Sequence, residues 1–220
     1  MQYLTICQRV HDLIGYQGQF TSVQATGYQA TITRAVQDAY EDIQRYRVDW
    51  QWLKNVRNIN VSDASDEYTI DELWGAGNLP HDFSSYRYIN WTKDNRTRRL
   101  IEVPYDAYML MDFENFGSYE PRLWSYKPWD KSLLISPVNK VYTLELHYLK
   151  TLHVLTNNTD VPFIPERHQQ AIIYGAVMKL STFTGDPTLF DTYSVKYAEE
   201  LGQLLREENP RKVVTKRPIA

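Results

Sequence analysis

Hydrophobic periodicity divides this 220-residue chain into three parts and constrains its fold more than any other feature. At both ends, over about residues 4–53 and 165–209, apolar residues recur at steps of three and four, which is typical of amphipathic helices. Between these regions the period shortens toward two, as in half-buried strands. We therefore predict an α+β fold in which residues 1–53 and 165–209 form a helical bundle, 54–151 a β-rich insertion, 152–164 a linker and 210–220 an extended C-terminal arm.

Two helices are predicted before the insertion. Their apolar stripes consist of Tyr3, Ile6, Cys7, Val10, Leu13 and Ile14 in the first, and of Ile32, Val36, Ala39, Ile43, Tyr46, Trp50 and Leu53 in the second. Thr5 followed by Gln8, and Thr26 followed by Gln29, have the form of capping boxes at the two starts. Gly15 is expected to end the first helix.

The insertion is predicted to contain short strands and to be rich in aromatic side chains. The strands are expected near residues 56–61, 68–70, 86–91, 98–103, 124–127, 133–135 and 141–149, with one or two helical turns between 105 and 113. The chain has 17 tyrosines and 6 tryptophans, side chains that suit interfaces as well as sugar binding. The richest candidates for tail or neighbour contacts are Tyr86, Tyr88, Trp91, Trp124 and Trp129, and the alternative is that most of them fill the core of a small sheet.

Helical signals return after the insertion. Pro165 suits the first position of a helix, and Gly185 is expected to end that helix. Asp186 and Pro187 then form an N-cap and a first-turn proline for the last helix, which stops before Pro210. The apolar arc of the earlier helix, made of Ala171, Ile172, Ile173, Ala176, Val177, Leu180 and Phe183, is broad enough to predict a central position.

The segment after Pro210 is short, basic and free of acidic residues. Its candidate contact residues are Arg211, Lys212, Val213, Val214, Lys216, Arg217, Pro218 and Ile219. A frayed terminus explains such a segment. An arm that becomes ordered on a partner, with its apolar residues inserted and its cations on acidic surface, explains it equally well. The residues alone leave both interpretations open.

Composition excludes several classes of function. The net charge of −3 gives no overall attraction to nucleic acid or to an anionic membrane, and a single cysteine excludes an intramolecular disulfide. No apolar run approaches the roughly 18 residues of a membrane span, and no secretion signal is seen at the start. Neither the histidines nor the glycines follow a metal-binding or phosphate-binding spacing, so we expect no metal and no cofactor.

Three segments, in their order along the chain, resemble the head-to-tail adaptor (connector) proteins of tailed bacteriophages. They are YLTIC at residues 3–7, the helix from Arg34 through AYEDI at 39–43 into DWQWL at 49–53, and VPFIPERH at 161–168 leading into IIYGA at 172–176. As an order of elements the resemblance covers nearly the whole chain.

This resemblance implies a structural virion protein of the phage neck, made in the host cytoplasm and carried at the head–tail junction. It implies a ring, usually of twelve subunits, that joins the portal protein to a tail or nozzle protein and lets packaged DNA pass without specific binding. It also implies that the tail at residues 211–220 corresponds to the arm that reaches the portal. Neither an enzyme nor a membrane partner is expected.

Two alternatives use the aromatic insertion differently. A peptidoglycan-degrading module needs a pair of carboxylates, one with a raised pKa, and Asp63, Asp66, Glu67, Asp71 and Glu72 lie close together in the sequence. Such acids beside serine more often make a solvated turn. A carbohydrate-binding module would use the tyrosines and tryptophans, although such modules are usually all-β and the long flanking helices argue against one.

Overall fold

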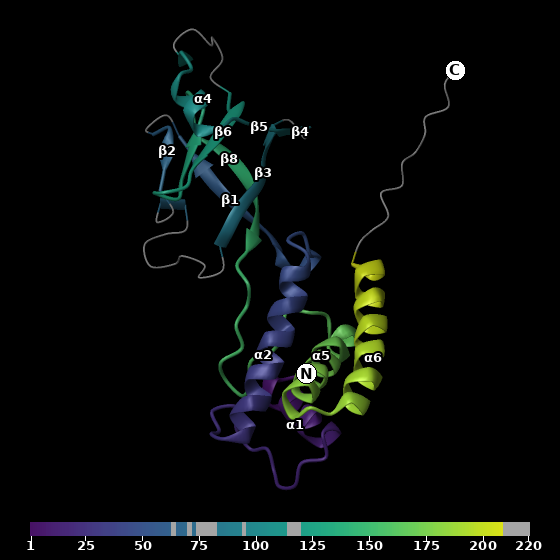
Figure 1. Ribbon diagram of the computed structural model, residues 1–220. Coiled ribbons are helices and arrows are strands. Elements are labelled where there is room, and N and C mark those ends of the chain that lie inside the picture. Colours follow the sequence, from purple (N-terminus) through teal and green to yellow (C-terminus); the bar gives the residue numbers. More distant parts are fainter. Residues whose placement is uncertain (63–64, 70–71, 74–82, 94–95, 114–119, 209–220) are drawn as a thin grey trace, which may run out of the picture. The chain divides into compact units, whose positions relative to one another are not determined.

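A computed structural model describes residues 1–62, 65–69, 72–73, 83–93, 96–113 and 120–208 (Figure 1). The chain is mixed α and β, as predicted, and its described residues form two sheets. It divides into two compact units. Met1–Trp52 with Leu152–Ala220 make one, called here the helical unit, and Leu53–Thr151 make the other, the β unit. No helix among the described residues combines the length and the apolar character needed to cross a membrane.

The helical unit is organised around α5 (Gln170–Thr184), which packs against α1 (Tyr3–Leu13), α2 (Tyr28–Tyr46) and α6 (Pro187–Glu207). Because three helices surround α5, its apolar residues cover a broad arc. Six of the seven residues predicted for that arc are buried, and Phe183, which lies 72% exposed, is the exception.

The start of α1 is held by backbone groups, not by a capping box. Tyr3 N donates to Asp160 O at 2.7 Å, and Leu4 N donates to Asn158 O at 3.1 Å. These carbonyls satisfy two of the N–H groups that the first turn of a helix leaves unpaired. Thr5 already lies inside the helix, so the prediction of a capping box at Thr5 and Gln8 was wrong.

The second helix departs from prediction at both ends. Gly27 is its N-cap residue and no side chain caps it, so the capping box at Thr26 and Gln29 was also wrong. The helix ends at Tyr46, well before the predicted end at residue 53. Trp50 nevertheless stays in the core, 1% exposed, because the chain turns back and its Nε1 donates to Ile43 O at 2.9 Å.

The junction between α5 and α6 has the predicted signals. Gly185 adopts a left-handed conformation with φ of 72°. This conformation has little steric cost for glycine because glycine has no Cβ. The carboxylate of Asp186 accepts hydrogen bonds from Thr188 N and Leu189 N, both at 3.0 Å, and Pro187 stands at the first helical position. These predictions are confirmed.

Residues 152–164, predicted as a linker, belong to the helical unit. Leu155 is fully buried, and the Gln44 side chain makes two hydrogen bonds to the backbone of His153. The short turn η3 (Glu166–His168) then leads into α5.

The β unit contains two four-stranded sheets that share one core. One has the order β1-β8-β3-β4 and the other β2-β7-β6-β5. The strands are β1 (Lys54–Val61), β2 (Glu67–Tyr68), β3 (Phe83–Lys93), β4 (Arg96–Arg99), β5 (Ile101–Glu102), β6 (Leu123–Lys127), β7 (Ser132–Ile135) and β8 (Tyr142–Lys150), and α4 (Tyr105–Met109) and η1 (Gln51–Leu53) complete the elements. The shared core includes Ile89 and Leu144 from the first sheet and Leu133 and Ile135 from the second.

The predicted single strand over residues 98–103 was wrong. Leu100, 2% exposed, divides it into β4, which pairs with β3, and β5, which pairs in parallel with β6 of the other sheet. The chain therefore changes sheets at this residue, and its apolar side chain enters the core at the crossing.

Candidate interaction surfaces

The last turn of α6 is tied to the turn before α5. Arg167 Nε lies 2.9 Å from Glu207 Oε2, and His168 Nε2 lies 3.1 Å from the same oxygen. Glu208 contributes a longer contact to Arg167, at 3.6 Å. Carboxylates at the C-terminus of a helix are unfavourable beside its partial negative charge, and a cation offsets this cost. We call Arg167, His168, Glu207 and Glu208 the clasp.

The clasp lies at the point from which the predicted arm begins. Residues 211–220 themselves lie outside the described residues, so their contacts stay a prediction. His168 is 2% exposed, so its imidazole is packed inside the helical unit. The last described turn of the chain is thus held to η3 by one buried imidazole and one guanidinium.

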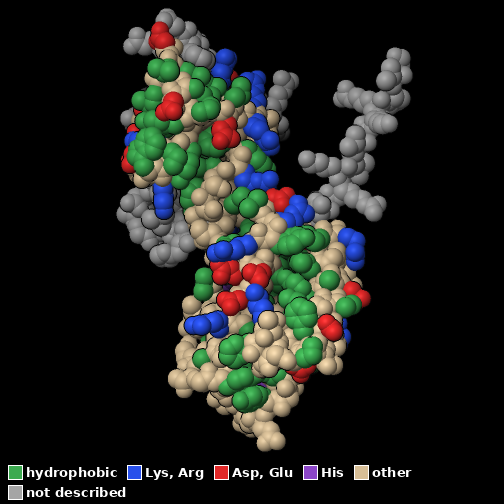
Figure 2. All heavy atoms as spheres, in the orientation of Figure 1, with side chains coloured by type: hydrophobic (Ala, Val, Ile, Leu, Met, Phe, Trp, Pro, Cys, Tyr) green, Lys and Arg blue, Asp and Glu red, His purple; other side chains and the backbone are tan. Residues whose placement is uncertain are grey.

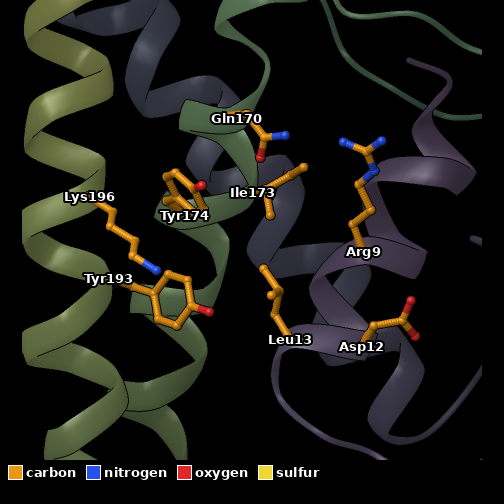
Figure 3. A pocket seen from close by; sticks show the side chains of 8 residues that line it. All are labelled: Arg9, Asp12, Leu13, Gln170, Ile173, Tyr174, Tyr193 and Lys196. Atoms are coloured by element: carbon orange, nitrogen blue, oxygen red, sulfur yellow. The ribbon is translucent and has the colours of Figure 1, made fainter.

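A second surface is a pocket of about 290 Å³ between α1, α5 and α6 (Figure 3). Leu13 and Ile173 supply apolar walls, while Arg9 and Lys196 bring cations to its two sides. Lys196 Nζ lies 4.9 Å from the centre of the Tyr193 ring, which favours a cation over its face. Within the part of the chain that the structure describes, neither Arg9 nor Lys196 forms an ion pair.

The five aromatic candidates of the insertion lie in different environments. Trp91 and Trp124, each 2% exposed, are core residues, and Tyr86 packs against the same core. Burial raises the pKa of Tyr86, as expected for a phenol removed from water. Trp129 is exposed, and Tyr88, like Tyr86, is partly buried.

Tyr88 is part of a stack that crosses three strands. Its ring lies 4.1 Å from that of His147 on β8, and the guanidinium carbon of Arg99 on β4 lies 3.9 Å from its centre. Trp129 is 64% exposed and meets Tyr105 of α4 edge-on at 4.7 Å. Met109 and Leu110 at the end of α4 are also exposed, so apolar surface is available around this helix.

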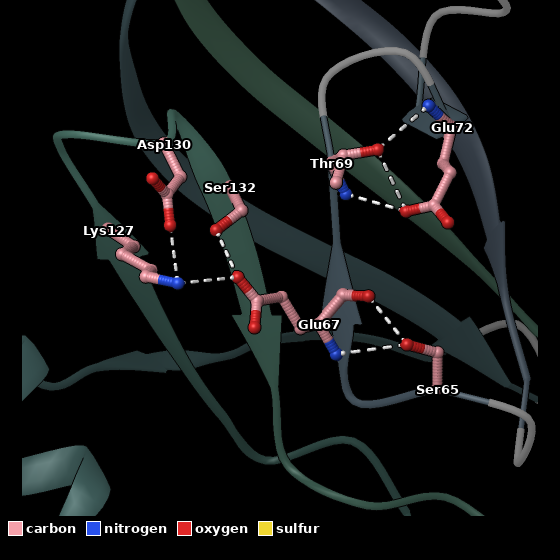
Figure 4. A network of polar contacts seen from close by, with 7 residues as sticks. All are labelled: Ser65, Glu67, Thr69, Glu72, Lys127, Asp130 and Ser132. Carbon is pink, nitrogen blue, oxygen red and sulfur yellow. Dashed lines mark hydrogen bonds and ion pairs between the residues drawn. The ribbon is translucent and has the colours of Figure 1, made fainter.

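Two of the acidic residues considered for catalysis, Glu67 and Glu72, take part in local polar contacts (Figure 4). Glu67 Oε1 accepts from Ser132 Oγ at 2.7 Å and pairs with Lys127 Nζ at 3.1 Å. These contacts, the serine first, lower the pKa of Glu67, whereas the acid of a glycosidase needs a raised pKa. Glu72 Oε2 is occupied by the N–H and hydroxyl of Thr69.

The remaining acids do not complete a site among the described residues. Asp63 and Asp71 lie outside them, so a carboxylate pair that includes either stays untested. No group of three or more histidine, cysteine, aspartate or glutamate side chains in the described ranges is placed to hold a metal ion. Cys7 is buried, and burial raises its pKa to about 12, which leaves it a protonated core residue at neutral pH.

The described surfaces thus combine charged groups with exposed apolar area. The family model for the SU10 adaptor protein matches residues 1–217, and the chain belongs to that family. It is a bacteriophage head-to-tail adaptor, a structural protein of the virion, and the family is not an enzyme family. Among curated proteins, none matches the chain.

Sequence reasoning missed the clasp and the pocket. Two glutamates at the end of a helix are electrostatically unfavourable, and that pattern alone could have indicated a cationic partner. Nothing in the sequence distinguishes Arg9 or Lys196 from other charges on the polar face of a helix, because the pocket exists only where three helices meet.

Proposed function

We propose that this adaptor forms a ring of twelve subunits at the head–tail junction, joining the portal protein to a tail or nozzle protein, with packaged DNA passing through the central channel. The match of the adaptor family over residues 1–217 carries this proposal. In it, a helical bundle built from both chain ends is the ring-forming framework. The β unit, inserted between the two chain ends, makes the contacts with the tail or with neighbouring subunits. Tyr88 and Trp129 are its aromatic anchors for these contacts.

The portal contact is assigned to the arm, residues 211–220. Four cations together with Val213, Val214 and Ile219 cannot form a core of their own, but they can add contacts along a groove. Ordering such a segment costs roughly 1–2 kcal/mol per residue in backbone entropy. A ring of identical arms offsets this cost through multivalency, so modest contacts from each arm produce a durable joint.

The clasp supports this assignment because it gives the arm a fixed origin. Glu207 is held by Arg167 and His168, which belong to the turn before the central helix. A segment that starts from a fixed point explores less volume than one attached to a frayed helix end, and its effective concentration at a partner site is higher.

Deletion of residues 211–220 tests the proposal. The truncated protein is expected to keep its melting temperature, because no described contact depends on those residues, and to lose stable attachment to portal-containing heads. A matched control replaces the same ten positions with glycine and serine, which keeps the length but removes the cations and apolar side chains. If either variant attaches as well as the full chain, the arm is not the portal contact.

Images of heads incubated with the full chain test the ring. A closed ring beneath the portal is expected, and counting its subunits checks the number twelve. Bound protein without rotational order around the portal axis would contradict the ring.

A further inference from the structure

The helical unit carries two hollows of opposite character, lined by different residues. The first is the pocket of about 290 Å³ bordered by Arg9 and Lys196. The second, about 140 Å³, lies between α2 and the extended segment at residues 152–155. The residues that line the two hollows are entirely different.

The first hollow combines positive charge with apolar walls. Arg9 on α1 and Lys196 on α6 stand on its two sides, and their charges are not neutralised by any described residue. Leu13, 40% exposed, lies between them. Its one acid, Asp12, leaves an excess of positive charge. An occupant that fits must bring a carboxylate together with a small apolar side chain.

The second hollow offers that combination. Asp38 lines it and forms no ion pair with any described residue, whereas Glu41 beside it is paired with Arg45 at 2.5 Å. Val154 projects at the same place and is 64% exposed. In Figure 2 acidic and basic side chains gather over α2. Glu41 is paired with Arg45 and Asp42 with Lys179, which leaves Asp38 as the carboxylate of this group without a partner among the described residues.

Val154 stands on a braced segment. The residue before it, His153, receives two hydrogen bonds from the Gln44 side chain, at 3.0 and 2.8 Å. The carbonyl of the residue after it, Leu155, accepts from Gln37 Nε2 at 2.7 Å. Because both flanking residues are held to α2, Val154 keeps one position and loses little freedom when it enters a partner.

We propose that Val154 and Asp38 of one copy of this chain dock into the pocket between Arg9 and Lys196 of the next copy. Val154 would fill the space beside Leu13 and Ile173, and the Asp38 carboxylate would meet the two cations. The two surfaces are different patches on one unit, so the contact is heterologous and can repeat around a closed ring. The inference names the subunit interface of the ring and therefore rests on the proposed function.

Paired cysteines test the contact directly. The variant Leu13→Cys with Val154→Cys is bound to portal-containing heads and oxidised mildly. A ladder of covalently linked chains is expected, because every subunit offers one cysteine to each neighbour. Each single variant, oxidised in the same way, is the matched control and can give at most linked pairs. The natural Cys7 is fully buried and does not contribute.

Charge exchange provides a second test. Asp38→Arg is expected to weaken ring formation on heads by about tenfold, as is Arg9→Asp, since each brings like charges together. The double variant with both changes is expected to recover most of the loss. Arg87→Asp, an exposed charge change on β3 outside both hollows, is the control, and melting temperatures exclude unfolding.

The outcomes separate the two proposals. If wild-type rings form but the paired cysteines give no ladder and charge exchange has no effect, this interface is wrong and the proposed function stands. If the wild-type chain forms no ring on portal-containing heads, both are overturned. A ladder together with recovery in the double variant establishes the contact.

Discussion

His168 Nε2 and Glu207 Oε2 lie 3.1 Å apart and join the turn before α5 to the last turn of α6. The two residues are 39 positions apart in sequence, yet they meet at the end of the described chain. The imidazole is 2% exposed while the carboxylate is partly open to solvent. This contact holds the last described turn of the chain to the rest of the helical unit.

Removing the carboxylate should loosen that origin without unfolding the protein. Glu207→Ala is expected to leave the melting temperature nearly unchanged, because partly exposed ion pairs contribute about 0–1 kcal/mol. Amide hydrogen exchange in the last turn of α6 should become at least about threefold faster, since local opening there no longer breaks the clasp. Glu199→Ala, on the exposed face of the same helix, is the control. Equal exchange in the two variants would show that the clasp does not restrain the helix end.

Replacement by alanine should affect stability differently at two glycines within helices. A Cβ at Gly202 would have its nearest neighbour at 3.6 Å, so Gly202→Ala is expected to stabilise by about 1 kcal/mol through helix propensity. A Cβ at Gly175 would lie 3.0 Å from the Tyr197 ring and 3.2 Å from Ala39 Cβ. Overpacking of this kind costs roughly 1–3 kcal/mol, which should cancel or exceed the gain. Urea unfolding of both variants measures the difference, and equal stabilisation would contradict the close approach of α2, α5 and α6.

The stability of the helical unit should depend on the ionisation of Asp160 at acid pH. Hydrogen bonds from the backbone of Asn157 and Thr156 lower its pKa from 3.8 to about 2. A carboxyl with a lowered folded-state pKa contributes stability above its unfolded pKa, and that contribution disappears as pH falls toward the folded value. The loss is therefore expected between about pH 4 and pH 2.

The variant Asp160→Asn isolates this contribution. It should be less stable than wild type at neutral pH, and the difference should shrink toward pH 2 because the wild-type carboxyl becomes protonated. Urea unfolding at several pH values follows the difference. A difference that stays constant with pH would assign the effect of the mutation to packing and not to titration.

The polar network at Glu67 is expected to be structural. Purified protein should not clear peptidoglycan, because the carboxylate that accepts from Ser132 and pairs with Lys127 has a lowered pKa and is a poor proton donor. Glu67→Gln should leave this negative result unchanged and should lower stability by removing the negative charge opposite Lys127. If wild type clears peptidoglycan and Glu67→Gln abolishes clearing while remaining folded, the structural assignment is incomplete.

Features governed by a few adjacent residues could be predicted from the sequence. The junction between α5 and α6 depends on the backbone freedom of Gly185 and on the reach of the Asp186 carboxylate to amides two and three residues ahead. The mixed α+β class could be predicted because apolar residues at steps of three and four suit only helices, whereas alternation at a period of two suits only strands. The family resemblance rested on the order of short segments, and the family match over residues 1–217 confirms it.

Features governed by distant partners could not be predicted. The cap of α1 comes from carbonyls more than 150 residues away, at Asn158 and Asp160, and no local pattern encodes their position. The apolar spacing through Trp50 predicted a continuous helix, but that spacing shows only that the side chain is buried. Trp50 is buried by a chain that turns back after Tyr46, so the same spacing occurs without a helix. Leu100 shows the same ambiguity in the β unit, where one alternating run supplies strands to two sheets.

The sequence by itself therefore determined the class of elements, the helix boundaries set by glycine, aspartate and proline, and the adaptor family. Only the tertiary structure decided which aromatic residues are core and which are surface, how Arg167 and His168 meet Glu207, and where Asp38, Arg9 and Lys196 stand on the helical unit. Periodicity reports that a side chain is buried or exposed on its own element. An interaction surface or the clasp depends on which other elements pack beside a residue, and only the packing of the whole unit determines those neighbours.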